Sequence, residues 1–229
     1  MNKNRTPLII TGAIIFAIGA AFFSLAGYYI DWLWFESVGF TSVWSTVLFT
    51  RIQLFLIVGI LTAALLSANI YIAYKRRPLY VPMNIEVSGV ERLRAQIEPV
   101  RRWVFLGITA AVVYFAGTSG MIFWREWLQF RNSTDFGVTD PQFNLDISFF
   151  AFKLPMYQAL IGWGISTLVL AALASAFVHY MYGGIRTDVQ TDRTTVAARV
   201  QISILLGLIV LLKAVAYWFD RYALALQEG

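Results

Sequence analysis

The sequence predicts an all-α membrane protein, a bundle of about five transmembrane helices with the N-terminus inside and the C-terminus outside. Five long runs of the 229-residue chain contain almost no charge, and only 14% of all residues are charged. A soluble domain usually has about a quarter of its residues charged. The Lys and Arg residues are concentrated in alternate connections between the runs. These observations indicate that the five runs lie in lipid.

The five uncharged runs define the predicted helices of a single transmembrane domain, residues 1–229. They cover residues 8–30, 52–74, 103–124, 154–180 and 200–219, with one interruption in the last run, at Lys213. The first run has 23 residues and, at about 1.5 Å per residue, crosses a hydrocarbon core roughly 30 Å thick. Backbone groups in lipid must pair within their own segment, and transmembrane strands would be about half as long and alternating. The runs are therefore predicted to be helices.

The first run has an alternative interpretation as a cleavable signal peptide. Lys3 and Arg5 precede it, and residues 24–26 resemble a cleavage site. The run is long for a signal peptide, however, and the bulky side chains of Tyr28 and Trp32 follow that site. The sequence favours a retained membrane anchor.

The distribution of basic residues predicts the orientation. The N-terminus, the segment 75–102 and the connection between the fourth and fifth runs contain twelve of the 18 Lys and Arg residues. Short cytoplasmic loops collect such residues, so these segments are predicted to be cytoplasmic. Seven of the eight Trp residues lie near the predicted outer boundary, as in an ordinary aromatic belt. The formal net charge of +5 is therefore interpreted as a topology signal, and no nucleic-acid partner is expected.

The cytoplasmic segment 75–102 is predicted to contain a short amphipathic helix on the inner leaflet. Val90, Leu93, Ile97 and Val100 recur at helical spacing. Four arginines flank them and are candidates for contact with anionic lipid headgroups: Arg92, Arg94, Arg101 and Arg102. A basic loop that only sets the topology is the commoner explanation of such a segment, and a site for a partner or nucleic acid is a further alternative, which the interspersed glutamates disfavour.

The segment 125–153 is predicted to be an extracytoplasmic loop. It contains Asp135, Asp140 and Asp146, whose spacing of five and six residues matches no calcium-binding loop. Asp140 precedes Pro141, and Gly137 permits a tight bend, as is typical of turns. We therefore expect the carboxylates to accept hydrogen bonds from nearby backbone N–H groups instead of binding a metal.

Four stretches resemble a known family. They are DWLWFESVGF at 31–40, FGVTDPQFNLDISFFAFKLP at 136–155, HYMYGGI at 179–185 and LKAVAYWFDRYAL at 212–224. They are similar to the membrane-embedded N-terminal part of the uncharacterised protein family number 0182, a group of large bacterial multi-pass membrane proteins. The family-like residues of the outer loop are Phe136, Gly137, Asp140, Pro141, Phe143, Asp146, Phe149, Phe152, Leu154 and Pro155.

The resemblance implies a multi-pass protein of the plasma (inner) membrane of bacteria or archaea. It also implies further spans and a large extracytoplasmic region, so the chain is either a truncated form or a distinct short member. No established activity and no catalytic residues follow from the resemblance.

Lys213 is the only ionisable residue well inside a run, and Asp220 follows it seven residues later on the same helix face. Snorkelling or pairing within the bundle explains such a lysine, and a role in ion or substrate passage is the alternative. The single histidine, His179, near the inner end of the fourth run, is expected to be an interfacial hydrogen-bonding residue. Alanines four residues apart, at 13, 17 and 21 and at 172 and 176, indicate close helix packing.

The function predicted from the sequence is a structural or assembly role, as a scaffold or complex subunit that holds partner proteins in a bacterial plasma membrane. The sequence has no cysteine, P-loop, dinucleotide fingerprint, zinc signature or nucleophile elbow, so we expect no cofactor, no metal and no enzymatic activity. The expected partners are the lipid bilayer and other membrane proteins. The alternative is a component of a transporter or channel, in which Lys213 and Asp220 would begin a polar path.

Overall fold

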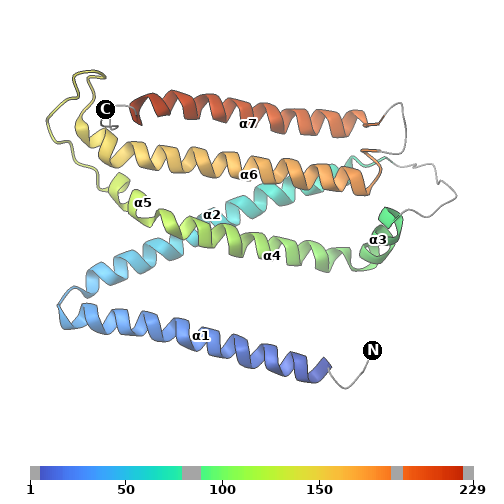
Figure 1. The fold of residues 1–229 in the computed structure, drawn as a ribbon, viewed down its shortest axis with the longest axis horizontal. Coiled ribbons are helices and arrows are strands. Elements are labelled where there is room, and N and C mark those ends of the chain that lie inside the picture. The colour runs from blue at the N-terminus through green and yellow to red at the C-terminus, as the bar shows by residue number, and fades with distance from the viewer. Residues whose placement is uncertain (1–5, 79–88, 187–192, 224–229) are drawn as a thin grey trace. The chain divides into compact units, whose positions relative to one another are not determined.

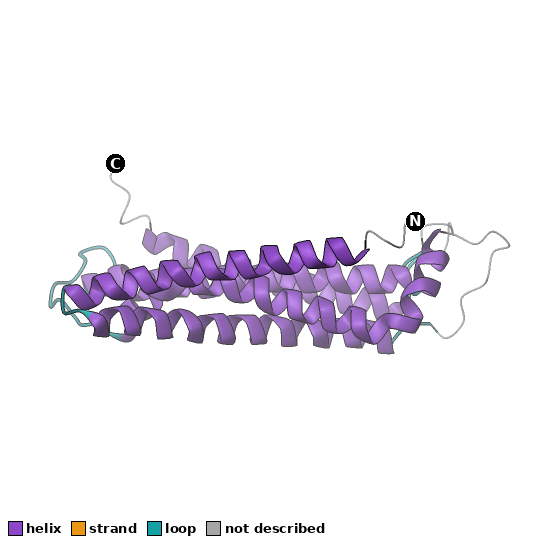
Figure 2. Cartoon of the chain, turned by 90° about the horizontal axis from the view of Figure 1, so that it is seen from below, coloured by secondary structure: helices purple, strands orange, loops and turns teal. Residues whose placement is uncertain are grey.

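The computed structural model describes residues 6–78, 89–186 and 193–223. The chain divides into two compact units, Met1–Thr50 and Arg51–Gly229. Every regular element of the described residues is helical (Figure 2), apart from two isolated bridges between single residues. The predicted all-α class is confirmed.

The first unit contains α1 (Thr6–Ser37) and the beginning of α2 (Thr41–Lys75). The whole of the predicted first span, 8–30, lies within α1. A tight turn joins the two helices, and Gly39 adopts a φ of 76° in it. The Phe40 N–H donates to the carbonyl of Phe35, and the Gly39 N–H donates to that of Glu36. Glycine suits this position because a left-handed backbone at a helix end strains other residues.

Four helical stretches of the described residues are long and apolar enough to cross a membrane. They are Thr41–Lys75, Arg92–Arg131, Phe149–Met181 and Val196–Tyr222. The second stretch combines the end of α3 (Gly89–Ile97) with α4 (Arg101–Gly120) and α5 (Trp124–Arg131). The third contains α6 (Leu154–Met181), and the fourth contains α7 (Val196–Ala223) except for its last residue. Together with α1, they account for the predicted helices.

The helix boundaries differ from the uncharged runs in two ways. First, α2 begins eleven residues before the predicted 52, and α7 extends past both ends of 200–219. Charge need not end a helix once the chain has left the hydrocarbon, so the runs underestimate the helices. Second, the predicted loop 125–153 is partly helical. It contains most of α5 and a π-helical turn, Phe149–Lys153. In α5, Glu126 lies in the first turn and Arg131 in the last. Both charges interact favourably with the helix dipole and so stabilise the helix.

The core of the second unit is small and is shared by its long helices. Leu66 of α2, Ala171 of α6 and Leu205 of α7 form a buried cluster, and Val112 of α4 packs against it. The helices α6 and α7 run side by side (Figure 1). The indole N–H of Trp163 donates to the Thr62 hydroxyl at 2.9 Å and so links α6 to α2. Many large apolar side chains remain exposed, as expected where lipid tails replace water.

The helices α2 and α4 approach each other at glycines. A Cβ atom placed on Gly59 would lie 2.7 Å from the backbone oxygen of Val113, and one on Gly117 would lie 2.8 Å from that of Phe55. Such distances leave no room for a side chain, so the two backbones are in contact. Of the alanines noted in the sequence, Ala172 packs against the core cluster, whereas the side chains at 13, 17 and 21 lie outside the described residues.

Candidate functional site

A buried polar network joins three helices of the second unit. The side-chain N–H groups of Gln201 on α7 donate to Ser175 Oγ of α6 at 3.1 Å and to the backbone oxygen of Asn69 of α2 at 3.0 Å. Gln201 Oε1 lies 3.0 Å from His179 Nε2 of α6. Ser175 and His179 are at most 1% exposed, and Gln201 is 8% exposed. The network is therefore sealed from solvent.

The pattern of donors indicates which ring nitrogen of His179 donates to Gln201. Both amide hydrogens of Gln201 are used by acceptors, so its oxygen accepts from the Nε2–H of His179. In a neutral imidazole the other nitrogen, Nδ1, then has no proton. Nδ1 is buried and has no hydrogen-bond partner among the residues that the structure describes, and a Cβ atom on Gly184 would lie 2.8 Å from it. A glycine at 184 leaves room for the ring.

The hydrogen-bonding role expected for His179 is confirmed. The ring lies inside the bundle and bonds across to α7, because Gln201 is brought beside it from the next helix. Hydrogen bonds between membrane helices contribute on average about 0.6 kcal/mol and at most about 1.7 kcal/mol. The network links α2, α6 and α7 through three such contacts.

An apolar cavity of about 520 Å³ lies at the same end of these helices, between α2, α3, α4 and α6. Its size falls in the range of roughly 300–1,000 Å³ that is usual for ligand sites. The walls are mostly apolar. Because the side chains of Tyr71, Ile108 and Phe177 line the cavity and are also exposed, the cavity is open on one side. The main apolar lining residues are Ile70, Ile97, Phe105, Ile108, Phe177 and Met181.

Two tyrosines and several arginines are in contact at the charged end of the cavity. The rings of Tyr74 and Tyr182 meet edge to face at 5.2 Å. The guanidinium of Arg77 lies 4.0 Å from the Tyr74 ring centre, and that of Arg94 lies 4.9 Å from the Tyr182 ring centre. Such cation–π contacts hold arginine side chains without neutralising their charge.

Glu98 is the carboxylate of this cluster. It accepts from Arg101 Nη1 at 2.6 Å and from the hydroxyl of Tyr182 at 3.1 Å. Arg101 also donates to the Tyr74 hydroxyl at 2.6 Å. These bonds connect the end of α6 with the helical turn that leads from α3 into α4, and they account for both hydrogens on Arg101 Nη1.

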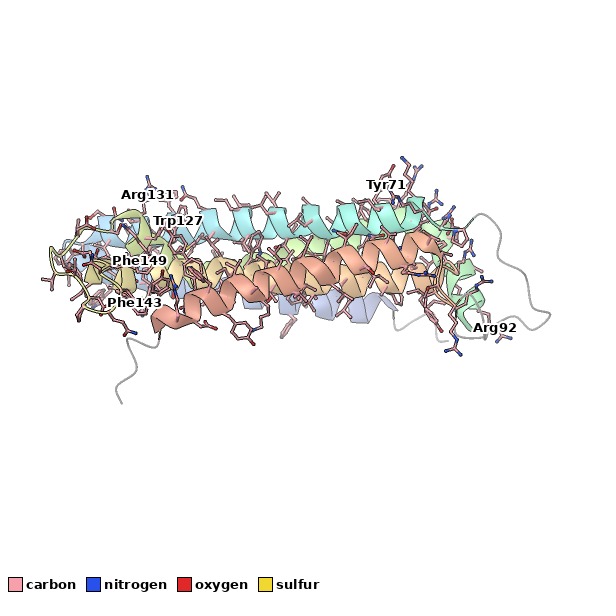
Figure 3. All side chains as sticks on the ribbon, turned by 90° about the horizontal axis from the view of Figure 1, so that it is seen from above. Tyr71, Arg92, Trp127, Arg131, Phe143 and Phe149 are labelled. Carbon is pink, nitrogen blue, oxygen red and sulfur yellow. The ribbon has the colours of Figure 1, made fainter. Side chains whose placement is uncertain are left out.

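The four arginines predicted to contact headgroups are not equivalent. Arg94, Arg101 and Arg102 line the cavity, whereas Arg92 is exposed and projects outward from α3 (Figure 3). The sequence could not separate them, because which face of α3 meets the cavity depends on how α3 packs against α6.

Lys213 and Asp220 are both exposed on α7. The Lys213 ammonium lies 5.3 Å from the ring centre of Tyr217, and no ion pair joins it to Asp220 among the described residues. Seven residues correspond to about 10 Å along a helix, which explains why two residues on one face do not meet. The interpretations of Lys213 as a snorkelling residue or as part of a polar path both remain predictions.

The segment 125–153, predicted to face outward, is held by its own carboxylates. Asp146 accepts from the backbone N–H groups of Phe136 at 3.1 Å, Gly137 at 2.8 Å and Ser148 at 2.8 Å. Asp140 Oδ2 accepts from the N–H groups of the turn that follows Pro141, at 2.7 and 3.0 Å. The predicted turn chemistry is confirmed. No group of three His, Cys, Asp or Glu residues that could hold a metal occurs in the part of the chain that the structure describes.

Aromatic rings attach this segment to the ends of α6 and α7. The ring centres of Phe143 and Phe149, labelled in Figure 3, lie 4.9 and 5.4 Å from that of Tyr222 on α7. Phe136 meets Phe152 at 5.4 Å. Leu154 is 2% exposed, and Pro155 follows directly on the π-helical turn Phe149–Lys153 at the start of α6. We call residues 136–155 with Tyr222 the outer clamp.

Asp146→Asn is expected to loosen the outer clamp. The side chain of Ser148 and the N–H groups of Phe136, Ser148 and Gly137 hold the pKa of the Asp146 carboxyl well below its usual range. Because the folded pKa is lowered, the stabilisation is complete above the ordinary value of about 3.9 and is lost as the pH falls through the folded value. Amide protection at Phe136 and Gly137, corrected for intrinsic exchange, should therefore stay constant from neutral pH to about pH 4 and then fall.

In the Asp146→Asn variant, protection at these amides should be low and independent of pH over the same range. Asp220→Asn is the matched control, because that carboxylate is exposed and accepts no hydrogen bond among the described residues. Unchanged protection in Asp146→Asn would contradict the role assigned to this carboxylate.

Comparison with known proteins places these features in a sequence family. The model of the uncharacterised protein family UPF0182 matches residues 8–229. A UPF0182 protein of Streptomyces coelicolor is 44% identical over 228 residues, which is 100% of the chain and 23% of that protein. UPF0182 proteins of a Nocardioides species and of Thermobifida fusca are each 41% identical over 100% of the chain, which covers 23% and 22% of them. No solved structure matches the chain.

Proposed function

The chain belongs to the uncharacterised protein family UPF0182, and from this premise we propose that it is a structural scaffold in a bacterial plasma membrane. The chain spans less than a quarter of the length of the curated relatives it matches. In this proposal its helices support the rest of such a longer protein and hold partner proteins in a membrane complex.

The observation that supports this function is the fixing of α6 and α7 at both ends. At one end, Gln201 bonds to α2 and α6 through Asn69, Ser175 and His179. At the other end, the outer clamp packs on Tyr222 of α7. Helices held at both ends keep one geometry, which suits a framework better than a moving part.

The proposal includes the orientation predicted from the basic residues. The N-terminus and residues 75–102 face the cytoplasm, and residues 125–153 face outward. The support is the positive-inside distribution of Lys and Arg. The outer clamp then lies on the external side, where it can position an extracytoplasmic region or a partner.

A labelling experiment tests the scaffold and its orientation together. The chain has no cysteine, so Ser133→Cys introduces a single thiol directly after α5. On intact cells, a membrane-impermeant biotin maleimide should label this variant, and the labelled protein should be recovered in mild detergent with one partner at constant stoichiometry. Arg76→Cys, after the end of α2, is the control and should be labelled only in permeabilised cells.

Two results would overturn this reading. Labelling of Arg76→Cys instead of Ser133→Cys on intact cells would reverse the orientation. Selective solute flux in reconstituted vesicles that is abolished by Lys213→Met, but not by Lys75→Met at the end of α2, would replace the scaffold with a transport function.

A further inference from the structure

The cavity between α2, α3, α4 and α6 combines an apolar interior with a cationic end. Its interior is lined by side chains such as Ile70, Phe105 and Met181, and its open side exposes Tyr71 and Phe177. In a membrane helix bundle, an opening lined in this way faces lipid tails. The occupant that fits the interior is therefore an apolar chain that can enter from the bilayer.

The charges around the cavity are unbalanced. Arg77, Arg94, Arg101 and Arg102 gather around the two tyrosines, with Glu98 as the carboxylate of the cluster. Arg101 is engaged by Glu98, but Arg94 and Arg102 form no ion pair among the described residues. Arg77 Nη1 is buried without a hydrogen-bond partner in that part of the chain. The cluster therefore has an excess of positive charge and donors, which an anionic group would match.

We propose that this cavity binds one anionic phospholipid, with an acyl chain against Phe105 and Met181 and the phosphate at Arg94 and Arg102. An acyl chain that moves from the bilayer into the cavity exchanges one apolar environment for another, so the cavity wall contributes little affinity. Selectivity comes from the headgroup, because two unpaired guanidinium groups favour a net negative lipid over a zwitterionic one. This inference is independent of the scaffold role, since lipid binding is measured without any protein partner.

Native mass spectrometry of the purified chain, titrated with phosphatidylglycerol or phosphatidylcholine in detergent micelles, tests the proposal. The wild type should bind one phosphatidylglycerol more tightly than phosphatidylcholine. The double variant Arg94→Gln/Arg102→Gln should lose about fivefold in phosphatidylglycerol affinity for each arginine removed. The control Arg76→Gln/Arg92→Gln removes the same charge from the same end of the helices, and neither residue lines the cavity. It should keep the wild-type affinity.

A second pair of variants tests whether the lipid occupies the interior of the cavity. Ala174→Phe fills the cavity and should abolish the single tight site, whereas Ala110→Phe on the exposed surface of α4 should leave it intact. Ala174→Leu replaces the phenylalanine variant if circular dichroism shows a loss of helix. Equal affinities for the two lipids in the wild type, equal losses in the two arginine pairs, or tight binding that survives filling of the cavity would each overturn the proposal.

Discussion

Replacing Gly117 with leucine should separate α2 from α4 and destabilise the bundle by about 3 kcal/mol or more. The first atom of any side chain at this position would lie 2.8 Å from the backbone oxygen of Phe55 and 2.7 Å from its ring. A flexible ring can move aside, but a backbone oxygen within a helix cannot do so unless the helix moves. The loss of close packing between α2 and α4 is the main cost, because packing is what associates helices in lipid.

Unfolding by steric trapping in bicelles measures this effect directly. The matched control is Gly107→Leu on the same helix, where a Cβ atom would meet nothing within 4 Å. That variant should stay within about 1 kcal/mol of the wild type, since it changes only helix propensity and an exposed surface. Equal stabilities of the two variants would show that the glycine crossing is not a tight contact in the folded protein.

Gln201→Leu should cost about 2 kcal/mol of unfolding free energy, although leucine has nearly the same size. The substitution removes the acceptor of the His179 Nε2–H and the donor to Ser175 Oγ, and both groups are at most 1% exposed. A buried donor left without a partner costs more than the hydrogen bond itself contributes. Ser203→Leu, on the exposed face of the same helix, should have little effect.

The double variant His179→Leu/Gln201→Leu tests whether the loss of stability in Gln201→Leu comes from buried groups left without a partner. Removing both partners leaves neither group of this pair unsatisfied, so the double variant should be more stable than the sum of the two single changes predicts. Additive losses would indicate that His179 and Gln201 stabilise the bundle independently and that the bond between them contributes nothing.

The sequence determined the class of the protein because the conditions that lipid imposes on a membrane-spanning segment are local. A segment of about 20 residues must satisfy its own backbone and present apolar side chains, and both conditions can be read from consecutive residues. The same holds for the outer clamp, where Asp146 bonds to N–H groups no more than ten residues away. Helix ends were predicted less well, since helices such as α2 and α7 continue beyond the hydrocarbon.

Only the tertiary structure decided which residues meet across helices. The amide of Gln201 finds Asn69, 132 residues earlier in the chain, and the cavity selects Arg94 but not Arg92 from one short helix. The close crossing uses Gly59 and Gly117, whereas the sequence pointed to alanines at four-residue spacing. Rotation of a helix about its axis and its choice of neighbour depend on all the helices packed against it, so composition and spacing within one run do not contain that information.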